Sequence, residues 1–407
     1  MSFNTSLSGI NAANADLNVT ANNIANVNTV GFKESRAEFA DLFASTAYGL
    51  SRNAIGSGVK LSNVAQQFSQ GNFDTTGRGL DVAIDGEGFF VLNDNGARVY
   101  SRAGNFQPDP NGFIGTPDGK RLQVFAPNAN GNGFDVGRLT DLQLLTTTSP
   151  PQASTNVDMQ VTLPGNAAAP TVVPFDPTDT NTYNHSTGGA TVYDSLGVAH
   201  VQTSYFVKTA NANEWQVHNY IDGTAVGAPT TLQFSPAGAL LTPANGQITM
   251  APFTPTTGAG VMNLTLSLSG SAQYGSAFAL REINPDGYPA GKLNEIDIDP
   301  TGVVFARFSN GADVPLGQIA LSTFTNPQGL QPQGNNTWAE TYSSGEPRTG
   351  APDTADFGIL QSGSLEASNV DLTEQLVNMI TAQRNFQANA QMISTQDQIT
   401  QTIINIR

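Results

Sequence analysis

The sequence contains no cysteine in 407 residues, which excludes disulfides, thiolate metal sites and cysteine nucleophiles. Charge is also scarce, because only 12% of the residues are charged, about half the roughly 25% of an ordinary soluble domain. Five lysines are present, and 17 basic against 33 acidic residues give a net charge of −16. This balance offers no attraction to phosphate backbones or anionic lipid, so we expect no nucleic-acid partner.

Long apolar runs and a secretory signal are missing as well. No apolar run approaches the ~18 residues of a spanning helix, so no membrane insertion is expected. The first six residues place no basic side chain before an apolar stretch, which predicts that no signal peptide is cleaved. The length predicts two to four domains of about 100–200 residues each. With 39% hydrophobic residues and 41 glycines, each domain has enough apolar residues for a buried core.

Both ends of the chain show the hydrophobic period of a helix. Near the N-terminus apolar residues recur at spacings of four and three, and Asp16 is the one charged residue among positions 1–30. The pattern predicts a helix of about 22 residues there and one of about 37 residues at the C-terminus. We define the apolar seam as Leu7, Ile10, Leu17, Ile24, Leu372, Leu376, Met379, Phe386, Ile393, Ile399 and Ile403.

The two helices are expected to pair along this apolar seam as a coiled-coil-like inner domain. A pair with so few charges would be marginally stable alone, because most helix stability comes from packing. We therefore expect its outer faces to pack on copies of the same pair from other subunits, so that the helices form a polymerisation surface. Residues 368–371 (SNVD) predict a capping box at the start of the C-terminal helix.

The middle of the chain has β-type sequence. Short runs of β-branched and aromatic residues are separated by turn dipeptides at 95–96, 111–112 and 118–119, in which both residues can take positive φ. The predicted fold is mainly β with terminal α-helices. Its expected parts are an inner helical domain at 1–30 plus 364–407, a linker at 31–70 that orders against neighbouring subunits, a split middle β domain at 71–145 plus 285–363, and an inserted outer β domain at 146–284.

No catalytic, cofactor or metal site is predicted. His185, His200 and His218 lack the spacing of metal ligands, and no cysteine could complete a set. The glycines at 86–88 (GEG) lack the third glycine of a dinucleotide loop, and Lys120 lacks the upstream glycine of a phosphate loop. We therefore expect a protein that is not an enzyme and that carries no cofactor.

Several segments resemble signature sequences of the bacterial flagellar rod and hook axial proteins. The similar segments are 8–13 (SGINAA), 22–33 (NNIANVNTVGFK), 77–84 (GRGLDVAI), 88–90 (GFF), 100–106 (YSRAGNF), 363–372 (GSLEASNVDL) and 382–387 (AQRNFQ). Asn18 departs from the pattern, which more often has Asp there. The matching residues singled out are Asn23, Ile24, Asn26, Gly31, Phe32, Gly79, Leu80, Asp81, Gly88, Phe89, Phe90, Asn369, Asp371, Gln383 and Arg384.

This resemblance implies a helical homopolymer outside the cell. Its subunits would form a tube, with the helices as inner wall, the split β domain in the middle and the inserted domain outside. The tube would join the rod to the filament and transmit torque while bending, as a universal joint. The resemblance also implies export through the flagellar type III apparatus without a cleaved signal. The implied partners are a distal rod protein at the base, a hook cap during assembly and a hook–filament junction protein at the tip.

Two alternatives remain at this point. Rod members of the family share the chain ends but are similar to a shorter version without the outer insertion. The block that contains 191–197 (TVYDSLG) and 213–215 (NEW) therefore favours the hook type. The other alternative is a secreted β-rich glycan-binding protein with a helical stalk, for which an exposed aromatic platform is expected. Two tryptophans in the whole chain argue against that class.

Overall fold

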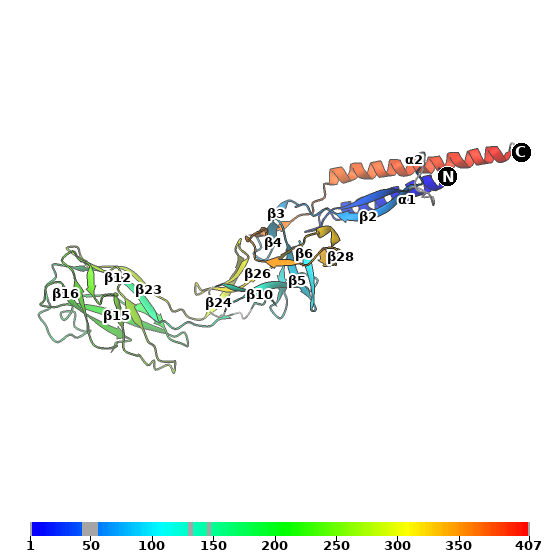
Figure 1. The fold of residues 1–407 in the computed structure, drawn as a ribbon. Coiled ribbons are helices and arrows are strands. Elements are labelled where there is room, and N and C mark those ends of the chain that lie inside the picture. The colour runs from blue at the N-terminus through cyan, green and yellow to red at the C-terminus, as the bar shows by residue number, and fades with distance from the viewer. Residues whose placement is uncertain (1, 43–55, 129–132, 145–147, 406–407) are drawn as a thin grey trace. The chain divides into compact units, whose positions relative to one another are not determined.

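The computed structural model describes residues 2–42, 56–128, 133–144 and 148–405 (Figure 1). Its chain separates into two compact units. Unit 1 comprises Met1–Leu145, Glu295–Ala306 and Asp313–Arg407, and unit 2 comprises Thr146–Asn294 and Arg307–Ala312. The fold is mainly β with a helix at each end, as the sequence predicts.

The two helices belong to unit 1. They are α1 (Ser2–Ala25) and α2 (Leu372–Asn405), of 24 and 34 residues. Asp371 caps α2, because its Oδ1 accepts hydrogen bonds from the amides of Thr373 (2.7 Å) and Glu374 (3.1 Å). The predicted capping box is therefore wrong. Ser368 lies outside the helix, and its hydroxyl accepts a hydrogen bond from the amide of Val370 instead.

Part of the predicted linker is a β-hairpin. Strands β1 (Ser35–Leu42) and β2 (Gly58–Gln66) pair antiparallel, and both contact α1. The amide of Val59 donates a hydrogen bond of 3.2 Å to the Ser8 hydroxyl of α1. The sequence-based description of 31–70 as a linker is thus corrected where the structure describes it, since its glycines had obscured two regular strands. Packing of this hairpin on neighbouring subunits stays a prediction.

The remainder of unit 1 is β structure around the strand path β26-β9-β5-β6-β29-β28. Its fully buried core includes Ile84, Phe90, Leu92 and Phe106. The short helix η1 spans Pro327–Gly329. The strands are β3 (Phe73–Thr75), β4 (Val82–Asp85), β5 (Phe89–Asp94), β6 (Ala97–Ser101), β7 (Gln107–Pro108), β8 (Ile114–Gly115), β9 (Arg121–Pro127), β10 (Phe134–Asp141), β26 (Asp313–Ile319), β27 (Leu321–Thr323), β28 (Gln331–Gly334), β29 (Thr337–Ala339), β30 (Arg348–Gly350), β31 (Ile359–Ser362) and β32 (Ser364–Glu366).

The predicted turns of unit 1 differ in their backbone. Between β5 and β6, Asn95 and Gly96 both have positive φ, 51° and 98°. At the other two predicted turns the glycine alone does, with φ of 81° at Gly112 and 90° at Gly119. The expectation of two positive φ values therefore holds for the first turn, where a two-residue loop joins two paired strands.

Unit 2 is built from two sheets, β13-β15-β16-β18-β19 and β20-β21-β12-β22. Buried residues alternate along β15 and β16, and Phe206, Trp215 and Val217 lie in the shared core. Strands β24 (Gly291–Ile298) and β25 (Val303–Phe308) have residues in both units. The strands of unit 2 are β11 (Thr148–Ser149), β12 (Asn156–Pro164), β13 (His185–Ser186), β14 (Ala190–Tyr193), β15 (Ala199–Lys208), β16 (Glu214–Ile221), β17 (Thr224–Ala225), β18 (Thr230–Phe234), β19 (Leu240–Thr242), β20 (Gln247–Thr249), β21 (Thr265–Ser267), β22 (Ala272–Tyr274) and β23 (Ala279–Pro285).

One of the three histidines is paired with carboxylates in unit 2. The ring of His200 lies between Asp222 (Nδ1 to Oδ2, 2.6 Å) and Asp194 (Nε2 to Oδ2, 3.3 Å). Burial lowers the pKa of His200, but the hydrogen bonds from Asp222 and Asp194 outweigh it, so the pKa is raised. Burial raises the pKa of Asp194, yet hydrogen bonds from Thr257, the Val198 amide and His200 bring it down to about 2.

The contribution of the His200 cluster to the unfolding free energy of unit 2 is expected to be largest between about pH 4 and 6.5, whereas burial of His185 and His218 lowers the pKa of both rings and acts in the opposite direction. A histidine with a raised pKa stabilises the fold below its unfolded pKa of about 6.5, and this contribution is lost as the pH rises through the folded value. The Asp194 contribution is lost as the pH falls below about 4 towards the folded value. The alkaline decrease should be about 1–2 kcal/mol. Urea unfolding followed by Trp215 fluorescence measures it. The difference in unfolding free energy between the unmodified chain and His200→Gln should therefore shrink as the pH rises above about 6.5, and a constant difference would contradict the assignment.

Candidate self-assembly interface

The two helices lie side by side and antiparallel (Figure 1). Asn23 of α1 donates a hydrogen bond of 3.1 Å to Gln375 of α2. At the other end, a Cβ on Gly9 would stand 2.5 Å from Oδ1 of Asn389, so the helices approach closely there. The buried residues of the helices are small or polar: Ser6, Ala13, Thr20, Asn23, Gln375 and Ala382.

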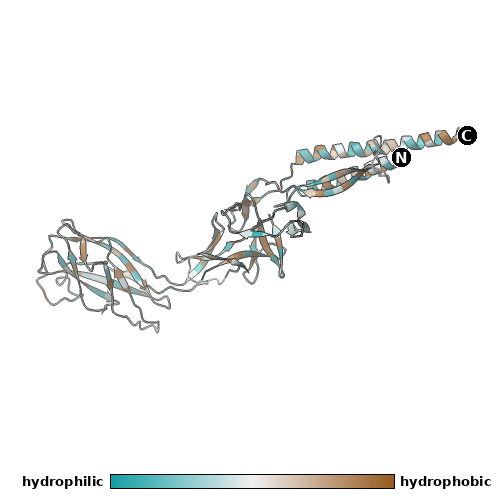
Figure 2. Cartoon of the chain, in the orientation of Figure 1, coloured by the Kyte–Doolittle hydropathy of each residue, from teal (hydrophilic) through white to brown (hydrophobic). Residues whose placement is uncertain are grey.

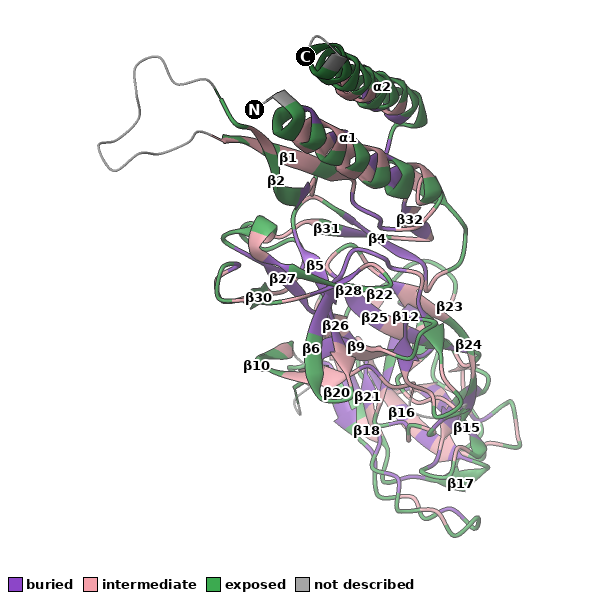
Figure 3. Ribbon diagram, turned by 90° about the vertical axis from the view of Figure 1, so that its right-hand side faces the viewer, coloured by how far each residue is buried: buried purple, intermediate pink, exposed green. Residues whose placement is uncertain are grey.

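The prediction that the helices pair along the apolar seam is therefore wrong. Small residues allow the two backbones to approach, and the Asn23–Gln375 hydrogen bond satisfies buried amide groups there. Figure 3 shows α2 exposed over most of its surface. The exposed seam residues are Leu7, Leu372, Leu376, Phe386, Ile399 and Ile403, at 38–65% exposure. The half-buried ones are Ile10, Leu17, Ile24, Met379 and Ile393.

The exposed apolar surface of α2 is larger than the seam. It also includes Val377, Ile380, Met392 and Ile404, which do not follow the heptad spacing and which the sequence reasoning missed. Figure 2 shows hydrophobic residues along α2, most densely towards its C-terminal end. These residues lie at several positions around the helix, and so many large apolar side chains left exposed on one helix indicate a surface that packs against another protein.

The last turns of α2 extend beyond α1. Asn23 lies beside Gln375 and Gly9 beside Asn389, so residue i of α1 faces residue 398 − i of α2. Since α1 begins at Ser2, residues 397–405 of α2 lie beyond its end. Ile399, Ile403 and Ile404 of this segment are 49–66% exposed.

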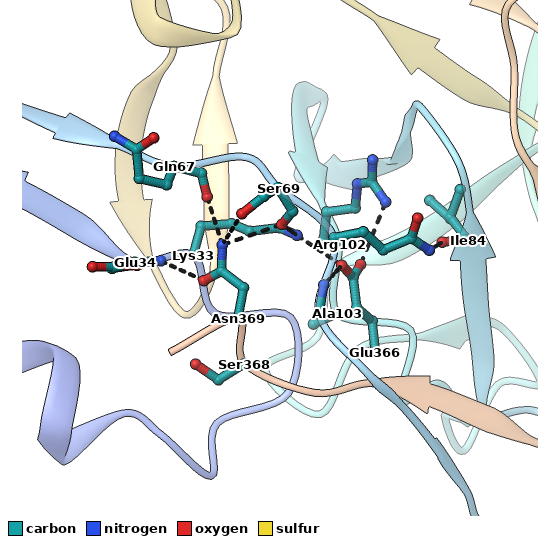
Figure 4. Close-up of polar contacts among 12 residues, drawn as sticks. Lys33, Glu34, Gln67, Ser69, Ile84, Arg102, Ala103, Glu366, Ser368 and Asn369 are labelled. Atoms are coloured by element: carbon teal, nitrogen blue, oxygen red, sulfur yellow. Dashed lines mark hydrogen bonds and ion pairs between the residues drawn. The ribbon is translucent and has the colours of Figure 1, made fainter. Parts of the chain in front are cut away.

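A buried charged junction connects both helices to the β domain of unit 1 (Figure 4). Lys33, which follows α1, lies 2.7 Å from Glu366 of β32, and both side chains are fully buried. Arg102 contacts the other oxygen of Glu366 at 3.4 Å. The Lys33 ammonium also donates to the carbonyl of Ser69 (2.8 Å), and the amide of Gly71 donates to Glu366 (3.0 Å). Burial lowers the pKa of Lys33, while Glu366 opposes this shift.

Asn369 adds a second connection beside the junction. Its Oδ1 accepts a hydrogen bond from the amide of Glu34 (2.7 Å), and its Nδ2 donates to the carbonyls of Gln67 (2.8 Å) and Ser69 (3.1 Å). Asn23 makes a similar pair of bonds with the backbone of Ser35. These side chains thus hold the segment after α1, the end of the hairpin and the start of α2 together, which explains why a short amide is needed at both positions.

The other residues of the flagellar motifs lie at several places in unit 1 outside the charged junction. Asp81 accepts a hydrogen bond from Thr76 (2.7 Å), and Asp371 caps α2. Phe32, Phe89 and Phe90 are buried, and so is Gly88, whereas Gly79 and Leu80 are half-buried. The side chain of Asn26 donates a hydrogen bond to the carbonyl of Asn22. Gln383 and Arg384 are exposed on α2. The structure therefore gathers the N- and C-terminal motifs at the junction, but leaves these last two residues facing outward.

Gly31 is required by its backbone and by its surroundings. Its φ is +67°, and a Cβ there would stand 2.5 Å from the amide nitrogen of Ala103. Gly77 has a similar φ of +72° with nothing within 4 Å. We expect Gly77→Ala to cost about 1–3 kcal/mol for the backbone alone. Gly31→Ala should cost about 1–3 kcal/mol more, because the methyl group collides with backbone. Urea unfolding followed by Trp338 fluorescence checks this difference, and equal losses would contradict it.

Among the residues that the structure describes, no cluster of three or more His, Asp or Glu side chains is arranged to hold a metal ion. Within the same part of the chain, neither helix combines the length and apolar content that crossing a membrane requires.

Four family models match successive parts of the chain. Residues 3–33 match "Flagella basal body rod protein" and residues 83–173 match "Flagellar hook protein FlgE/F/G D1 domain". Residues 156–288 match "Flagellar basal body protein FlaE D2 domain", and residues 361–406 match "Flagellar basal body rod FlgEFG protein C-terminal". Together they cover nearly all of both helices, the charged residues Lys33, Arg102 and Glu366 of the junction, and most of unit 2.

Relatives match over the whole length. The chain is 41% identical over 415 residues to the flagellar hook protein FlgE of Salmonella typhimurium, with 100% of both chains covered. It is 33% identical over 419 residues to that of Rhizobium meliloti, covering 99% of this chain and 98% of the relative. The crystal structure of Helicobacter pylori flagellar hook protein FlgE2 has a similar fold, with a TM-score of 0.52 at 17% identity, covering 72% of this chain and 100% of that one. The chain belongs to the flagellar hook protein FlgE family, whose members are structural proteins and not enzymes.

Proposed function

We propose that this chain is the subunit of a tubular flagellar hook, outside the cell, that transmits motor torque from rod to filament while bending. The observation that carries the proposal is the exposed apolar surface of α2, on a chain that matches hook proteins over its full length. Burying the exposed part of Leu376 or Phe386 against a neighbour would contribute about 0.6–1.4 kcal/mol per side chain, because 46% and 38% of these residues is exposed in the monomer. The rod and glycan-binding alternatives are not favoured by the full-length relatives.

The proposed tube has three layers. The helices, paired through their small and polar face, form the inner domain (1–30 plus 364–407), the split β domain (71–145 plus 285–363) forms the middle, and 146–284 forms the outer domain. Residues 31–70 pack on neighbouring subunits. Outer contacts between polar, weakly charged surfaces are individually weak and exchange easily with water, which suits subunits that slide as the tube bends.

The remaining partners follow from the family. They are the type III export apparatus, the distal rod protein at the base, the hook cap during assembly, and the hook–filament junction protein at the tip. No nucleic acid, membrane insertion or cofactor takes part. Electron microscopy of the purified protein tests the central claim, because a hook subunit should form tubes and a glycan-binding protein discrete oligomers.

Removing most of unit 2 is expected to leave a tube that is altered in shape or stiffness. Ser149 of β11 and Gly291 of β24 are register partners, so their backbones lie side by side. Replacing residues 150–290 with a short Gly/Ser turn therefore closes the chain without a gap. Electron microscopy of the shortened chain measures tube formation and curvature. If Trp338 fluorescence showed that unit 1 is still folded and yet no tubes formed, the result would count against the layered arrangement.

A further inference from the structure

One face of α2 carries a positive charge within its exposed apolar surface. Val377, Ile380 and Arg384 are spaced by three and four residues, so they lie on the same side of the helix. Val377 and Ile380 are 57% and 50% exposed, and Arg384 is exposed as well. In the part of the chain that the structure describes, no acid lies within ion-pair distance of the Arg384 guanidinium. Arg384 therefore belongs to the surface that the proposed function covers with neighbouring subunits.

This face of α2 points away from α1. Ala382 is fully buried, and the antiparallel alignment of the helices places it opposite Asp16 of α1. Each residue turns an α-helix by about 100°, so Arg384 lies about 200° around α2 from Ala382. The acid of α1 in the same copy is thus on the opposite side of α2, and a partner for Arg384 has to come from another molecule.

Assembly would remove Arg384 from water. A neighbour that covers Val377 and Ile380 also covers the guanidinium on the same face. A buried charge without a partner is unfavourable, whereas a carboxylate that accepts hydrogen bonds from the guanidinium compensates for the lost water. The neighbouring copy is therefore expected to place an acid opposite Arg384.

The two helices contain three acids, and Asp16 differs from the other two. Glu374 and Asp397 are exposed on α2, where water solvates them. Asp16 is half-buried, and within the described residues its carboxylate has no hydrogen bond or ion pair. Burial raises the pKa of Asp16, because the carboxylate ion loses water there without gaining a partner. A cation brought to Asp16 by another copy would supply that partner.

Asp16 also lies at a suitable position along the helix pair. It follows the buried Ala13 by three residues, so it stands about 60° from the covered face of α1, at the edge of the helix contact. Because Asp16 is opposite Ala382, its level along the axis is about 3 Å from that of Arg384, two residues further on. Two copies packed side by side with little axial shift would therefore bring Asp16 of one copy to Arg384 of the other.

We propose that Arg384 of one copy forms an ion pair with Asp16 of a second copy in the polymer. The guanidinium donates hydrogen bonds to the carboxylate, and the apolar residues beside Arg384 exclude water from the pair. The contact joins two different surfaces, so each copy can make it once with each side chain along an open helical polymer. This inference rests on the proposed self-assembly and names one contact within it.

Charge exchange in the full chain tests the ion pair. Arg384→Asp and Asp16→Arg should each raise the concentration needed for assembly at least about tenfold, because two like charges then face each other. The double variant Asp16→Arg/Arg384→Asp restores an ion pair and should assemble close to the concentration of the unmodified chain. Sedimentation measures all three.

The matched control combines Arg384→Asp with Asp397→Arg. It exchanges the same charges at an exposed acid of α2 and should assemble no better than Arg384→Asp alone. If this control recovered as well as Asp16→Arg/Arg384→Asp, or if that double variant failed to recover, Asp16 would not be the partner of Arg384.

Cross-linking tests the contact without introducing a large side chain. Because the chain has no cysteine, Asp16→Cys and Arg384→Cys each create a single thiol. The two variants, one of them with a longer tag, are assembled together and treated with a short bismaleimide. A covalent dimer of mixed size is expected in the polymer but not in dilute monomer. An assembled polymer without this mixed dimer would overturn the ion pair.

Failure of the ion pair can be told apart from failure of the proposed function. If the unmodified chain forms no polymer, the proposed function fails and the ion pair fails with it. If the unmodified chain forms tubes and the double variant does not recover, the ion pair is wrong while the proposed function stands.

Discussion

Replacing Glu366 with glutamine is expected to lower the unfolding free energy of unit 1 by about 3–5 kcal/mol. The substitution keeps the shape of the side chain but leaves Lys33 and Arg102 buried without a counter-charge. Lys33→Met should cost less, because Glu366 then still has Arg102 and the amide of Gly71 as partners. Urea unfolding followed by Trp338 fluorescence measures both, because Trp338 is buried in the core of unit 1.

The control for this experiment is Glu374→Gln. Glu374 is an exposed acid in the first turn of α2, and its loss should cost at most about 1 kcal/mol. Unit 2, followed by the fluorescence of its buried Trp215, should have the same urea midpoint in all three variants. If Glu366→Gln cost no more than Lys33→Met, the shared carboxylate would not be what stabilises the junction.

Leu376→Asp and Phe386→Asp are each expected to abolish tube formation while both units remain folded. Both side chains are exposed in the monomer, at 46% and 38%, so an acid can be accommodated there. In the polymer the same acid would be buried without a partner, and the roughly 0.6–1.4 kcal/mol from burying the exposed part of the apolar side chain would be lost in addition. Because about 1.4 kcal/mol changes an equilibrium constant tenfold, the concentration needed for assembly should rise by at least about tenfold. Sedimentation and electron microscopy measure this.

Leu241→Asp is the matched control. Leu241 is 53% exposed and belongs to unit 2, whereas both helices belong to unit 1. This variant should assemble at the concentration of the unmodified chain. Normal tubes from Leu376→Asp or Phe386→Asp would refute the role of the helix surface. Met379→Asp, at a half-buried seam position, should also prevent assembly but with some loss of monomer stability.

Features that depend on neighbouring residues in the chain could be predicted. The helical period placed α1 and α2 within a few residues of their ends, and the Asn95-Gly96 turn followed from its dipeptide. The hairpin of β1 and β2 was missed because glycines at 56 and 58 interrupt its pattern. The N-cap of α2 was misplaced by three residues, since Ser368 and Asp371 are both suitable capping residues.

The contact between the helices was not predictable from hydrophobicity. Small and polar residues recur every seven positions in both helices, at Ser6, Ala13 and Thr20 and at Gln375, Ala382 and Asn389. A search for apolar residues alone does not detect this period. This small and polar face lies between the helices because Gly9 and Ala13 let the two backbones approach closely, whereas the larger seam residues stay exposed or half-buried.

The sequence alone determined the two terminal helices, the β character between them and the family, because periodicity and long motifs are local properties of the chain. The tertiary structure decided which helix face is covered and which is exposed. It also brought Lys33, Arg102 and Glu366 together across 333 positions. Such a junction depends on which buried charges meet in three dimensions, and its free energy is set by desolvation that no single segment experiences alone.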